Sequence, residues 1–447
     1  MSTALKTDLY QLTMLAALYR KNLYKKIVTC EAFVRKLPPE RKFLIMAGTE
    51  EIRNFLLDLR FSREDIKQLK ELQPLKNIFI TSNFDKFLED FRFSGSMWAL
   101  AEGEIAFAGE PLVQITGTLV DVHMAETFVL SILNHDVKIA SKAARIVLAA
   151  RGRPVLELGT RRTHHEAAIN AARSAYLAGF AATSNVEAAI KYKIPIAGTM
   201  SHMWIMTHKN ELQAFQNFQD IFKTPTLLID TYDTIIGAIN AAKVSSLNGV
   251  RLDSGDFKTL SSSVRDILDK AGAKKAKIIV SGDLNEYSID DLICSGAPID
   301  TFAVGTELVL STDVPSLGIV FKVVYDHTEN RPLIKLSPGK TTFPGKKQIF
   351  LDQRNGGWSH LISLENAIQQ SEYLSPLLDC HISNGKKVEN CVVNLEISRK
   401  YCNAAMVNLH PQLASLKLET IDSPVYPDDS LKNLYEEAVN GLSLVVE

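Results

Sequence analysis

The side chains best able to do chemistry fall in six short polar clusters, each of which follows a run of aliphatic or β-branched residues. The clusters are ELGTRRTH (157–164), GTMSH (198–202), DTYD (230–233), RLDSGD (251–256), SGD (281–283) and VGT (304–306). Guanidinium groups and glycine amides bind anions, carboxylates bind Mg²⁺, and an imidazole acts as a nucleophile or proton acceptor. The clusters therefore predict a site for an anionic, metal-bound substrate.

Three of the clusters place a glycine at the end of a predicted strand. Gly255, Gly282 and Gly305 could each form only a tight turn between a strand and a helix. Because Ser281 and Thr306 add hydroxyl groups and helical patterns follow, we interpret the three turns together as amide cradles for phosphate oxygens.

Arginine residues occur in two of the clusters. Arg161 and Arg162 follow one predicted strand, and Arg251 ends another. Arg161 and Arg162 could form only surface ion pairs. An arginine fork, however, binds a carboxylate or a phosphate through two parallel hydrogen bonds. If Arg251 and the Arg161–Arg162 pair lie close together in the fold, they create a site for an anionic substrate.

Four aspartates flank the turns of two clusters. Asp230 and Asp233 belong to DTYD, and Asp253 and Asp256 belong to RLDSGD. Asp233 and Asp256 could simply cap the helices that follow. Asp253 precedes its turn, where capping is less natural, and a carboxylate beside a diphosphate commonly holds magnesium. We therefore expect a Mg²⁺-diphosphate substrate, with Asp253 and Asp256 as candidate metal ligands.

His202 ends the GTMSH cluster, ahead of a helix predicted over 203–218. A lone histidine is more often structural than catalytic. Its place at a strand end, facing carboxylates and phosphate-binding turns, favours a role as nucleophile or proton acceptor.

Alternating strands and helices must bring these clusters together. The aliphatic runs end 23 to 39 residues apart, about the length of a strand plus a crossover helix. They cover 155–158, 194–197, 227–229, 249–252, 277–280 and 301–304. Because the carboxyl ends of parallel strands lie on one face, distant clusters should surround one pocket. Six units are fewer than the eight of a regular barrel, so we predict an α/β fold with an irregular or incomplete α/β barrel.

The rest of the chain predicts an additional α+β domain built from N-terminal and C-terminal segments. Residues 1–120 and 320–447 are assigned to this outer domain or domains, 121–154 to a connecting helical segment, and 155–319 to the barrel-like catalytic domain. The outer patterns are helical over 7–19 and 49–59 and strand-like over 27–33, 111–117, 319–325 and 333–336.

Composition argues against several other classes of protein. Lys and Arg (50) almost cancel Asp and Glu (51), so no overall charge favours nucleic acid as a partner. The five cysteines include no C-x-x-C pair, which argues against a zinc module or a disulfide framework. No apolar run reaches the roughly 18 residues of a membrane span, and the early run 12–18 lacks a basic flank. We expect a cytoplasmic protein with no membrane partner.

Nine motifs, in identity and order, resemble those of the nicotinate phosphoribosyltransferase family, and the resemblance covers roughly residues 7–350. The motifs are TDLYQLTM (7–14), ELGTRR (157–162), TSN (183–185), GTMSH (198–202), DTYD (230–233), RLDSGD (251–256), SGDLNEY (281–287), FAVGTEL (302–308) and KLSPGK…PGKKQ (335–348).

The resemblance implies a reaction of NAD salvage. Nicotinate and 5-phosphoribosyl 1-diphosphate would give nicotinate mononucleotide and diphosphate, with Mg²⁺ and with coupled hydrolysis of ATP. On this mapping His202 accepts the γ-phosphate as a phosphohistidine, and Asp230 orients its imidazole. An oriented neutral ring is the better nucleophile.

The resemblance assigns the remaining site residues as well. Tyr10 would stack on the pyridine ring from the neighbouring subunit of a homodimer with shared active sites. Arg161, Thr199 and Arg251 would surround nicotinate and its carboxylate, with Leu158 as an apolar neighbour of the ring. The ribose, metal and phosphate contacts would come from Asp253, Gly282, Asp283, Gly305 and Thr306.

Three alternatives stay open. Nicotinamide phosphoribosyltransferases carry an aspartate that accepts from the carboxamide, and Ser184 takes its place here, which favours nicotinate. A non-catalytic phosphoribosyl or nucleotide sensor would not need His202 and Asp230. An isomerase or aldolase on a phosphate-binding barrel would ordinarily show a Lys or Glu base at a strand end, and Glu157 is the one such residue that we find.

Overall fold

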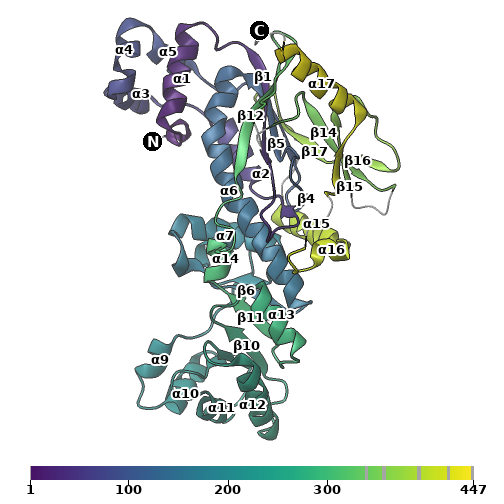
Figure 1. Cartoon of the computed structure of the whole chain (residues 1–447). Coiled ribbons are helices and arrows are strands. Elements are labelled where there is room, and N and C mark those ends of the chain that lie inside the picture. Colours follow the sequence, from purple (N-terminus) through teal and green to yellow (C-terminus); the bar gives the residue numbers. More distant parts are fainter. Residues whose placement is uncertain (1, 338–340, 355–358, 390–393, 420–422, 444–447) are drawn as a thin grey trace. The chain divides into compact units, whose positions relative to one another are not determined.

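The computed structural model describes residues 2–337, 341–354, 359–389, 394–419 and 423–443 (Figure 1). The chain divides into two compact units: residues 1–138, 316–413 and 419–447 form the first, and residues 139–315 and 414–418 form the second. The boundary falls within helix α6 (Leu119–Ala150), so the connecting helical segment predicted over 121–154 contributes to both units. Part of the KLSPGK motif, 338–340, lies outside the described residues.

The second unit is built on a six-stranded parallel sheet with the order β7-β6-β11-β10-β9-β8. Its strands are β6 (Val155–Glu157), β7 (Ala182–Thr183), β8 (Thr226–Leu228), β9 (Gly249–Leu252), β10 (Lys277–Ser281) and β11 (Thr301–Val304). Within the described part of the chain, β7 and β8 end the sheet and do not pair with each other. The predicted incomplete α/β barrel is confirmed.

One predicted strand of this sheet is wrong. Residues 194–197 form an isolated bridge, Ile196 to Thr183, and the strand at this edge is β7 instead. Thr183 N–H donates to the Pro195 carbonyl, and Ala197 N–H donates to the Thr183 carbonyl. Because Pro195 has no N–H of its own, this segment cannot continue a regular ladder.

Helices alternate with the strands of the second unit. Their bounds are α7 (His165–Leu177), α8 (Val186–Tyr192), α9 (His202–Met206), α10 (Glu211–Ile221), α11 (Thr234–Ala241), α12 (Phe257–Lys270), α13 (Glu286–Cys294) and α14 (Thr306–Leu310), with a 3-10 turn η2 (Thr160–Arg162). The single helix predicted over 203–218 is two helices, because Asn210 starts α10 as its N-cap, accepting from Gln213 N–H.

The first unit contains a seven-stranded antiparallel sheet assembled from both ends of the chain. The N-terminal segment supplies β1 (Ile27–Val34), β3 (Ser96–Leu100) and β5 (Val113–Thr118), and the C-terminal segment supplies β12 (Ile319–Asp326), β13 (Arg331–Pro332), β17 (Leu378–Ser383) and β18 (Lys386–Lys387). Strand β1 lies between β5 and β12. The predicted α+β domain built from both segments is confirmed.

Smaller sheets and further helices complete the first unit. A four-stranded sheet contains β14 (Lys347–Asp352), β15 (Ser359–Leu364), β16 (Leu374–Pro376) and β19 (Val425–Pro427), and a two-stranded sheet contains β2 (Leu44–Ile45) and β4 (Ile105–Ala106). The helices are η1 (Thr3–Leu5), α1 (Leu9–Arg20), α2 (Thr49–Leu57), α3 (Arg63–Leu69), α4 (Gln73–Thr81), α5 (Phe84–Asp90), α15 (Leu395–Val407), α16 (Pro411–Ala414) and α17 (Asp429–Ser443).

The predicted outer elements fall on α1, α2, β1, β5 and β12, with one exception. The strand predicted over 333–336 is wrong: β13 covers Arg331–Pro332, and after Leu333 N–H donates to the Val324 carbonyl the chain leaves the sheet. A run of four residues is too short for its periodicity to separate a strand from a loop.

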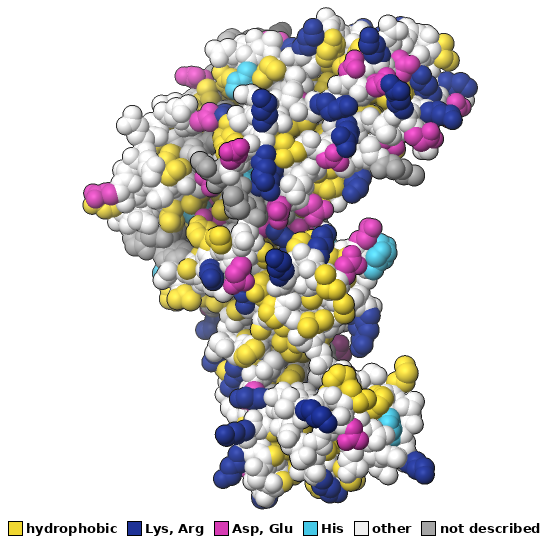
Figure 2. All heavy atoms as spheres, turned by 180° about the vertical axis from the view of Figure 1, so that it is seen from behind, with side chains coloured by type: hydrophobic (Ala, Val, Ile, Leu, Met, Phe, Trp, Pro, Cys, Tyr) yellow, Lys and Arg dark blue, Asp and Glu magenta, His cyan; other side chains and the backbone are white. Residues whose placement is uncertain are grey.

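Positive and negative side chains are interspersed over the face of the molecule that Figure 2 shows, as expected from a formal net charge of -1. Within the described residues, no helix has the length and apolar character that crossing a membrane requires.

Candidate active site

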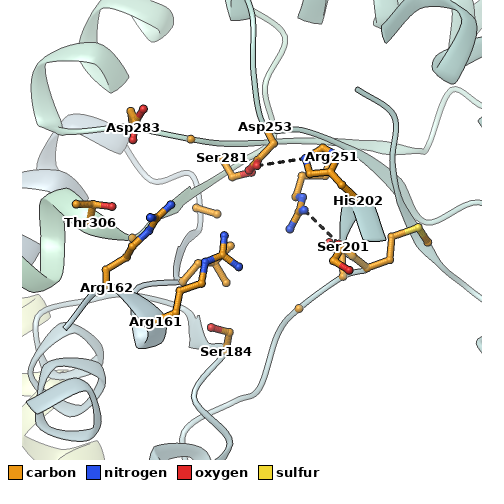
Figure 3. Close-up of a pocket in the computed structure, with 17 residues that line it drawn as sticks. Arg161, Arg162, Ser184, Ser201, His202, Arg251, Asp253, Ser281, Asp283 and Thr306 are labelled. Atoms are coloured by element: carbon orange, nitrogen blue, oxygen red, sulfur yellow. Dashed lines mark hydrogen bonds and ion pairs between the residues drawn. The ribbon is translucent and has the colours of Figure 1, made fainter. Parts of the chain in front are cut away.

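A pocket of about 330 Å³ opens at the carboxyl ends of the strands of the second unit (Figure 3). The predicted site residues that line it are Leu158, Arg161, Ser184, Thr199, His202, Arg251, Asp253, Ser281, Gly282, Asp283, Gly305 and Thr306. Arg162, Met200 and Ser201 line it as well. The strand-end clusters, far apart in the sequence, therefore meet at one pocket, as the rule for parallel strands requires.

Three guanidinium groups point into the pocket from two walls (Figure 3). Arg161 and Arg162 are exposed on η2, whereas Arg251 lies on β9 and is largely buried. Arg251 Nη2 donates to the Met200 carbonyl at 3.2 Å, but its buried Nε has no hydrogen-bond partner among the described residues. An anion bound in the pocket would give this donor of a charged group a partner.

Burial also dominates the electrostatics of Arg251. Burial lowers the pKa of the Arg251 guanidinium from its ordinary value; Asp253 and Asp230 act to raise it, and Arg161 acts to lower it. Arginine keeps its proton in proteins. The pocket thus contains a positive charge that water compensates poorly, and a carboxylate or phosphate would stabilise it.

His202 begins α9, and two polar groups flank its ring. Nδ1 lies 3.1 Å from the Thr231 hydroxyl, and Nε2 lies 3.7 Å from Asp253 Oδ2. The Thr231 hydroxyl can donate to Nδ1 or accept from it, and a proton on Nε2 would face the Asp253 carboxylate. Thr231 thus orients the ring with Nε2 on the side of Asp253.

The ring partner of His202 is Thr231 rather than the expected Asp230. Asp230 Oδ2 accepts from the Asp253 N–H at 2.9 Å and from the Ser254 hydroxyl at 2.6 Å, and so fixes the RLDSGD turn. Sequence reasoning missed Thr231, although it lies inside DTYD. Which of two adjacent residues turns towards the ring depends on the local backbone, and a motif does not specify that.

Asp256 and Gly255 do not line the pocket. Asp256 Oδ1 accepts from the Lys258 N–H at 3.2 Å, and its other oxygen accepts from the Thr259 hydroxyl, so Asp256 caps α12. The helix-cap interpretation that the sequence left open applies to it. Its role as a metal ligand stays a prediction. Gly255 has a φ of 91° and serves as a turn residue.

The carboxylates that face the pocket belong to Asp253 and Asp283. Asp253 Oδ1 accepts from the Ser281 hydroxyl, and Asp283 is exposed. Over the described ranges, no three or more His, Cys, Asp and Glu side chains gather to hold a metal ion. Two carboxylates suit a Mg²⁺ ion that arrives with a diphosphate, because the substrate and water then supply the other oxygen ligands.

The turn at 281–283 approaches the end of β9 closely. A Cβ atom on Gly282 would lie 2.2 Å from the Asp253 carbonyl oxygen, and the φ of Gly282 is 101°. Glycine alone allows both this contact and this conformation without strain. Asp283, with a φ of 46°, is also left-handed, so its surroundings must hold it in place.

A second turn, at Gly305 and Thr306, begins α14 beside the pocket. Gly305 provides no side-chain acceptor for the first N–H groups of this helix. The first N–H groups of a helix have no partner within the helix, and anion oxygens commonly bind them. The two turns, on the neighbouring strands β10 and β11, can therefore bind different parts of one polyanion.

Buried Glu157 shapes the wall that carries Arg161. Its two carboxylate oxygens accept from the Gly159 N–H and the Thr183 hydroxyl, and burial raises the pKa of this carboxyl above its ordinary value. The Ser184 N–H donates to the Glu157 carbonyl at 2.9 Å. Since both oxygens are engaged, Glu157 positions the wall and is a poor candidate for the base of an isomerase or aldolase.

Tyr10 lies in the first unit, on α1, and is absent from the pocket lining. Its side chain is 47% exposed, its hydroxyl accepts from Gln11 Nε2 at 2.9 Å, and its ring meets His123 edge-on at 6.5 Å between centroids. Its predicted role in stacking on a substrate from a second subunit stays a prediction.

Comparison with known proteins places the whole chain among enzymes of one kind. Residues 5–134 match the sequence model of the nicotinate phosphoribosyltransferase (NAPRTase) N-terminal domain, and residues 154–323 match that of the nicotinate phosphoribosyltransferase (NAPRTase) family. The chain is 36% identical to the nicotinate phosphoribosyltransferase pncB2 of Mycobacterium tuberculosis, over 96% of this chain and 92% of that protein. It is 34% identical to the nicotinate phosphoribosyltransferase of Bacillus subtilis, over 98% and 90% of the two chains.

A solved structure shares the fold. The human nicotinic acid phosphoribosyltransferase superposes with a TM-score of 0.84 at 24% identity, and the match covers 96% of this chain and 99% of that one. Both units of the fold therefore have counterparts in a known structure.

A matched pair of glycine substitutions tests the close approach of the 281–283 turn to β9. Gly272 and Gly282 both have left-handed φ, 84° and 101°, but a Cβ on Gly272 would meet nothing within 4 Å. Gly272→Ala should lower the free energy of unfolding by about 1–2 kcal/mol, the ordinary cost of a left-handed alanine. Gly282→Ala should cost clearly more, because its Cβ meets backbone. Urea unfolding measures both losses, and equal losses would contradict the close approach.

Proposed function

Because the chain belongs to the nicotinate phosphoribosyltransferase family, we propose that its pocket joins nicotinate to 5-phosphoribosyl 1-diphosphate and couples this transfer to hydrolysis of ATP. The protein is a transferase of NAD salvage that forms nicotinate mononucleotide and diphosphate. One observation supports the assignment of this reaction to the pocket. Arginines from η2 and from β9, the two phosphate-facing turns and His202 all line the same pocket.

The arginines account for recognition of the pyridine substrate. Nicotinate presents one carboxylate. Arg251, whose Nε–H has no partner among the described residues, lines the pocket together with Arg161. Ser184 lines the same wall, and its neutral hydroxyl does not repel the substrate anion as an aspartate would. Leu158 adds an apolar surface for the ring. These features favour nicotinate over nicotinamide.

The chemical step needs alignment more than a base. The pyridine nitrogen attacks the anomeric carbon of the ribose while the bond to diphosphate breaks, through an oxocarbenium-like state. The nitrogen is itself the nucleophile, so no side chain has to remove a proton. The protein holds the ring in line with the leaving group and stabilises the charge that develops on diphosphate.

The two turns hold the phosphates in this proposal. Ser281, Gly282 and Asp283 form one wall, and Gly305 and Thr306 form the next. Asp253 and Asp283 would hold Mg²⁺ that enters with the diphosphate, and this ion would offset the charge of the leaving group.

His202 would couple ATP to the transfer. Its Nε2 attacks the γ-phosphorus of ATP, the new N–P bond forms, and the bond to the bridging oxygen breaks so that ADP leaves. Nδ1–H donates to the Thr231 hydroxyl, at a present separation of 3.1 Å, and so fixes the ring orientation. Water later hydrolyses the phosphohistidine.

A homodimer with shared active sites would bring Tyr10 of one subunit to the pocket of the other. Tyr10 is accessible for such a role, since its side chain is half exposed. We also propose a cytoplasmic location, which the distribution of a fluorescent fusion between cell fractions would test.

Replacing His202 separates ATP coupling from the transfer. His202→Ala should abolish the stimulation by ATP and the acid-labile ³²P label from γ-labelled ATP, while some ATP-independent turnover remains at high phosphoribosyl diphosphate. His208→Ala is the matched control, because His208 contacts Trp204 and does not line the pocket. Undiminished ATP stimulation in His202→Ala would refute the role of this ring.

Replacing Arg251 tests recognition of the carboxylate. A hydrogen bond to a charged group is worth about 1.5–3 kcal/mol, so Arg251→Ala should lower kcat/KM for nicotinate roughly 10- to 150-fold. Arg151→Ala is the control, because Arg151 makes an exposed ion pair with Asp290. Steady-state kinetics measure both. An unchanged kcat/KM would remove Arg251 from the site.

Mixing two impaired variants tests the shared site. Tyr10→Ala and His202→Ala subunits, each impaired, should regenerate activity on mixing, since some mixed dimers contain one intact site. The measurement is activity after co-refolding, compared with each variant alone. Absence of any recovery would favour a self-contained site.

A further inference from the structure

A buried ion network outside the pocket connects the segments that follow its two phosphate-facing turns. Lys142, on α6, has a side chain that is 1% exposed. Its Nζ lies 2.5 Å from Glu286 Oε2 and 3.1 Å from Asp313 Oδ1. Glu286 begins α13, and Asp313 follows α14. One ammonium group thus bridges the segments that leave two neighbouring strands, β10 and β11.

Arg145 completes the network from the same face of α6. It lies three residues beyond Lys142, a spacing that places both side chains together. Arg145 Nε lies 3.0 Å from Glu286 Oε1, and Arg145 Nη2 donates to the Tyr287 hydroxyl at 3.1 Å. The Glu286 side chain is 0% exposed. Glu286 thus contacts both cations at a depth where water could not replace a missing partner.

The network anchors the 281–283 turn close to its end, and it reaches the Gly305–Thr306 turn through α14. The loop 282–285 is held by β10 on one side and by Glu286 on the other, and it contains Gly282 against the Asp253 carbonyl and the left-handed Asp283. A backbone held in such a conformation persists only where its surroundings fix it. Asp313, in the same way, fixes the chain just after α14, the short helix that Thr306 begins.

We propose that Lys142 is a positioning residue that sets the separation of the 281–283 turn from the Gly305–Thr306 turn, and hence the fit of phosphoribosyl diphosphate. This inference rests on the proposed function of the pocket. Donors that grip a polyanion must hold their places within a fraction of an ångström. A buried ion pair often adds little net stability compared with apolar packing, but it imposes one arrangement on the groups it joins.

Kinetics of Lys142→Met test the inference. The KM for phosphoribosyl diphosphate and the dissociation constant for Mg²⁺-diphosphate, measured by calorimetry, should each rise about tenfold. The KM for nicotinate should change less than twofold, because Arg251 lies on β9 and makes its hydrogen bond to the Met200 carbonyl, outside this network. Lys277→Met is the matched control: Lys277 Nζ lies 2.9 Å from Asp300 Oδ1, but its side chain is 60% exposed. All three constants should stay unchanged in the control.

A gentler variant guards against loss of folding. Asp313→Asn removes one carboxylate and leaves the contacts of Glu286 with both cations, so it should raise the same two constants about threefold. The inference would be overturned if Lys142→Met folds and its constants for the phosphate ligands are unchanged. If Lys142→Met fails to fold, the same result for folded Asp313→Asn would overturn it. An equal rise in the KM for nicotinate would also overturn it, since that indicates general disturbance. Wild-type protein that makes no nicotinate mononucleotide would instead contradict the proposed function.

Discussion

The wall of the pocket that we propose binds nicotinate contains one largely buried guanidinium, that of Arg251. Arg251 keeps its charge while burial lowers its pKa, and its Nε–H has no partner in the described part of the chain. Interiors rarely tolerate such a group unless something pairs with it. In the proposed function the carboxylate of nicotinate is this partner, because a carboxylate fits the fork of arginine.

The rest of the site depends on backbone placed by the sheet. Gly282 brings one turn against the Asp253 carbonyl, Asp230 ties the backbone of Asp253, and buried Glu157 holds the arginine turn beside β7. These contacts involve no substrate. They order the pocket walls before any ligand binds, and pre-ordered donors stabilise developing charge without reorganising during the reaction.

The sequence predicts most of the fold because its signals are periodic or repeated. Strands β6, β9, β10 and β11 follow from aliphatic runs that end in polar clusters, and they carry most of the pocket. The edge strand β7 has two residues, too few to give a pattern, and the run 194–197 contains a proline that prevents regular pairing. Composition and spacing thus identify the four central strands and the edge strand β8, and they miss the edge strand β7.

Within the site, residue types were easier to predict than their partners. Arg161, Arg251, His202 and Asp253 line the pocket as expected, whereas Asp256 caps a helix and Thr231 contacts the imidazole. Such choices between neighbouring residues depend on local backbone angles. The buried pairing of Lys142 with Glu286 and Asp313 was equally invisible, because it joins residues more than a hundred positions apart that belong to no common motif.

The most direct test of the central claim is product formation by the purified protein. Labelled nicotinate or nicotinamide is incubated with phosphoribosyl diphosphate and Mg²⁺, with and without ATP, and the nucleotides are separated by chromatography. The account predicts nicotinate mononucleotide as the product, formed faster with ATP, and little product from nicotinamide. No mononucleotide from nicotinate, or a preference for nicotinamide, would contradict it.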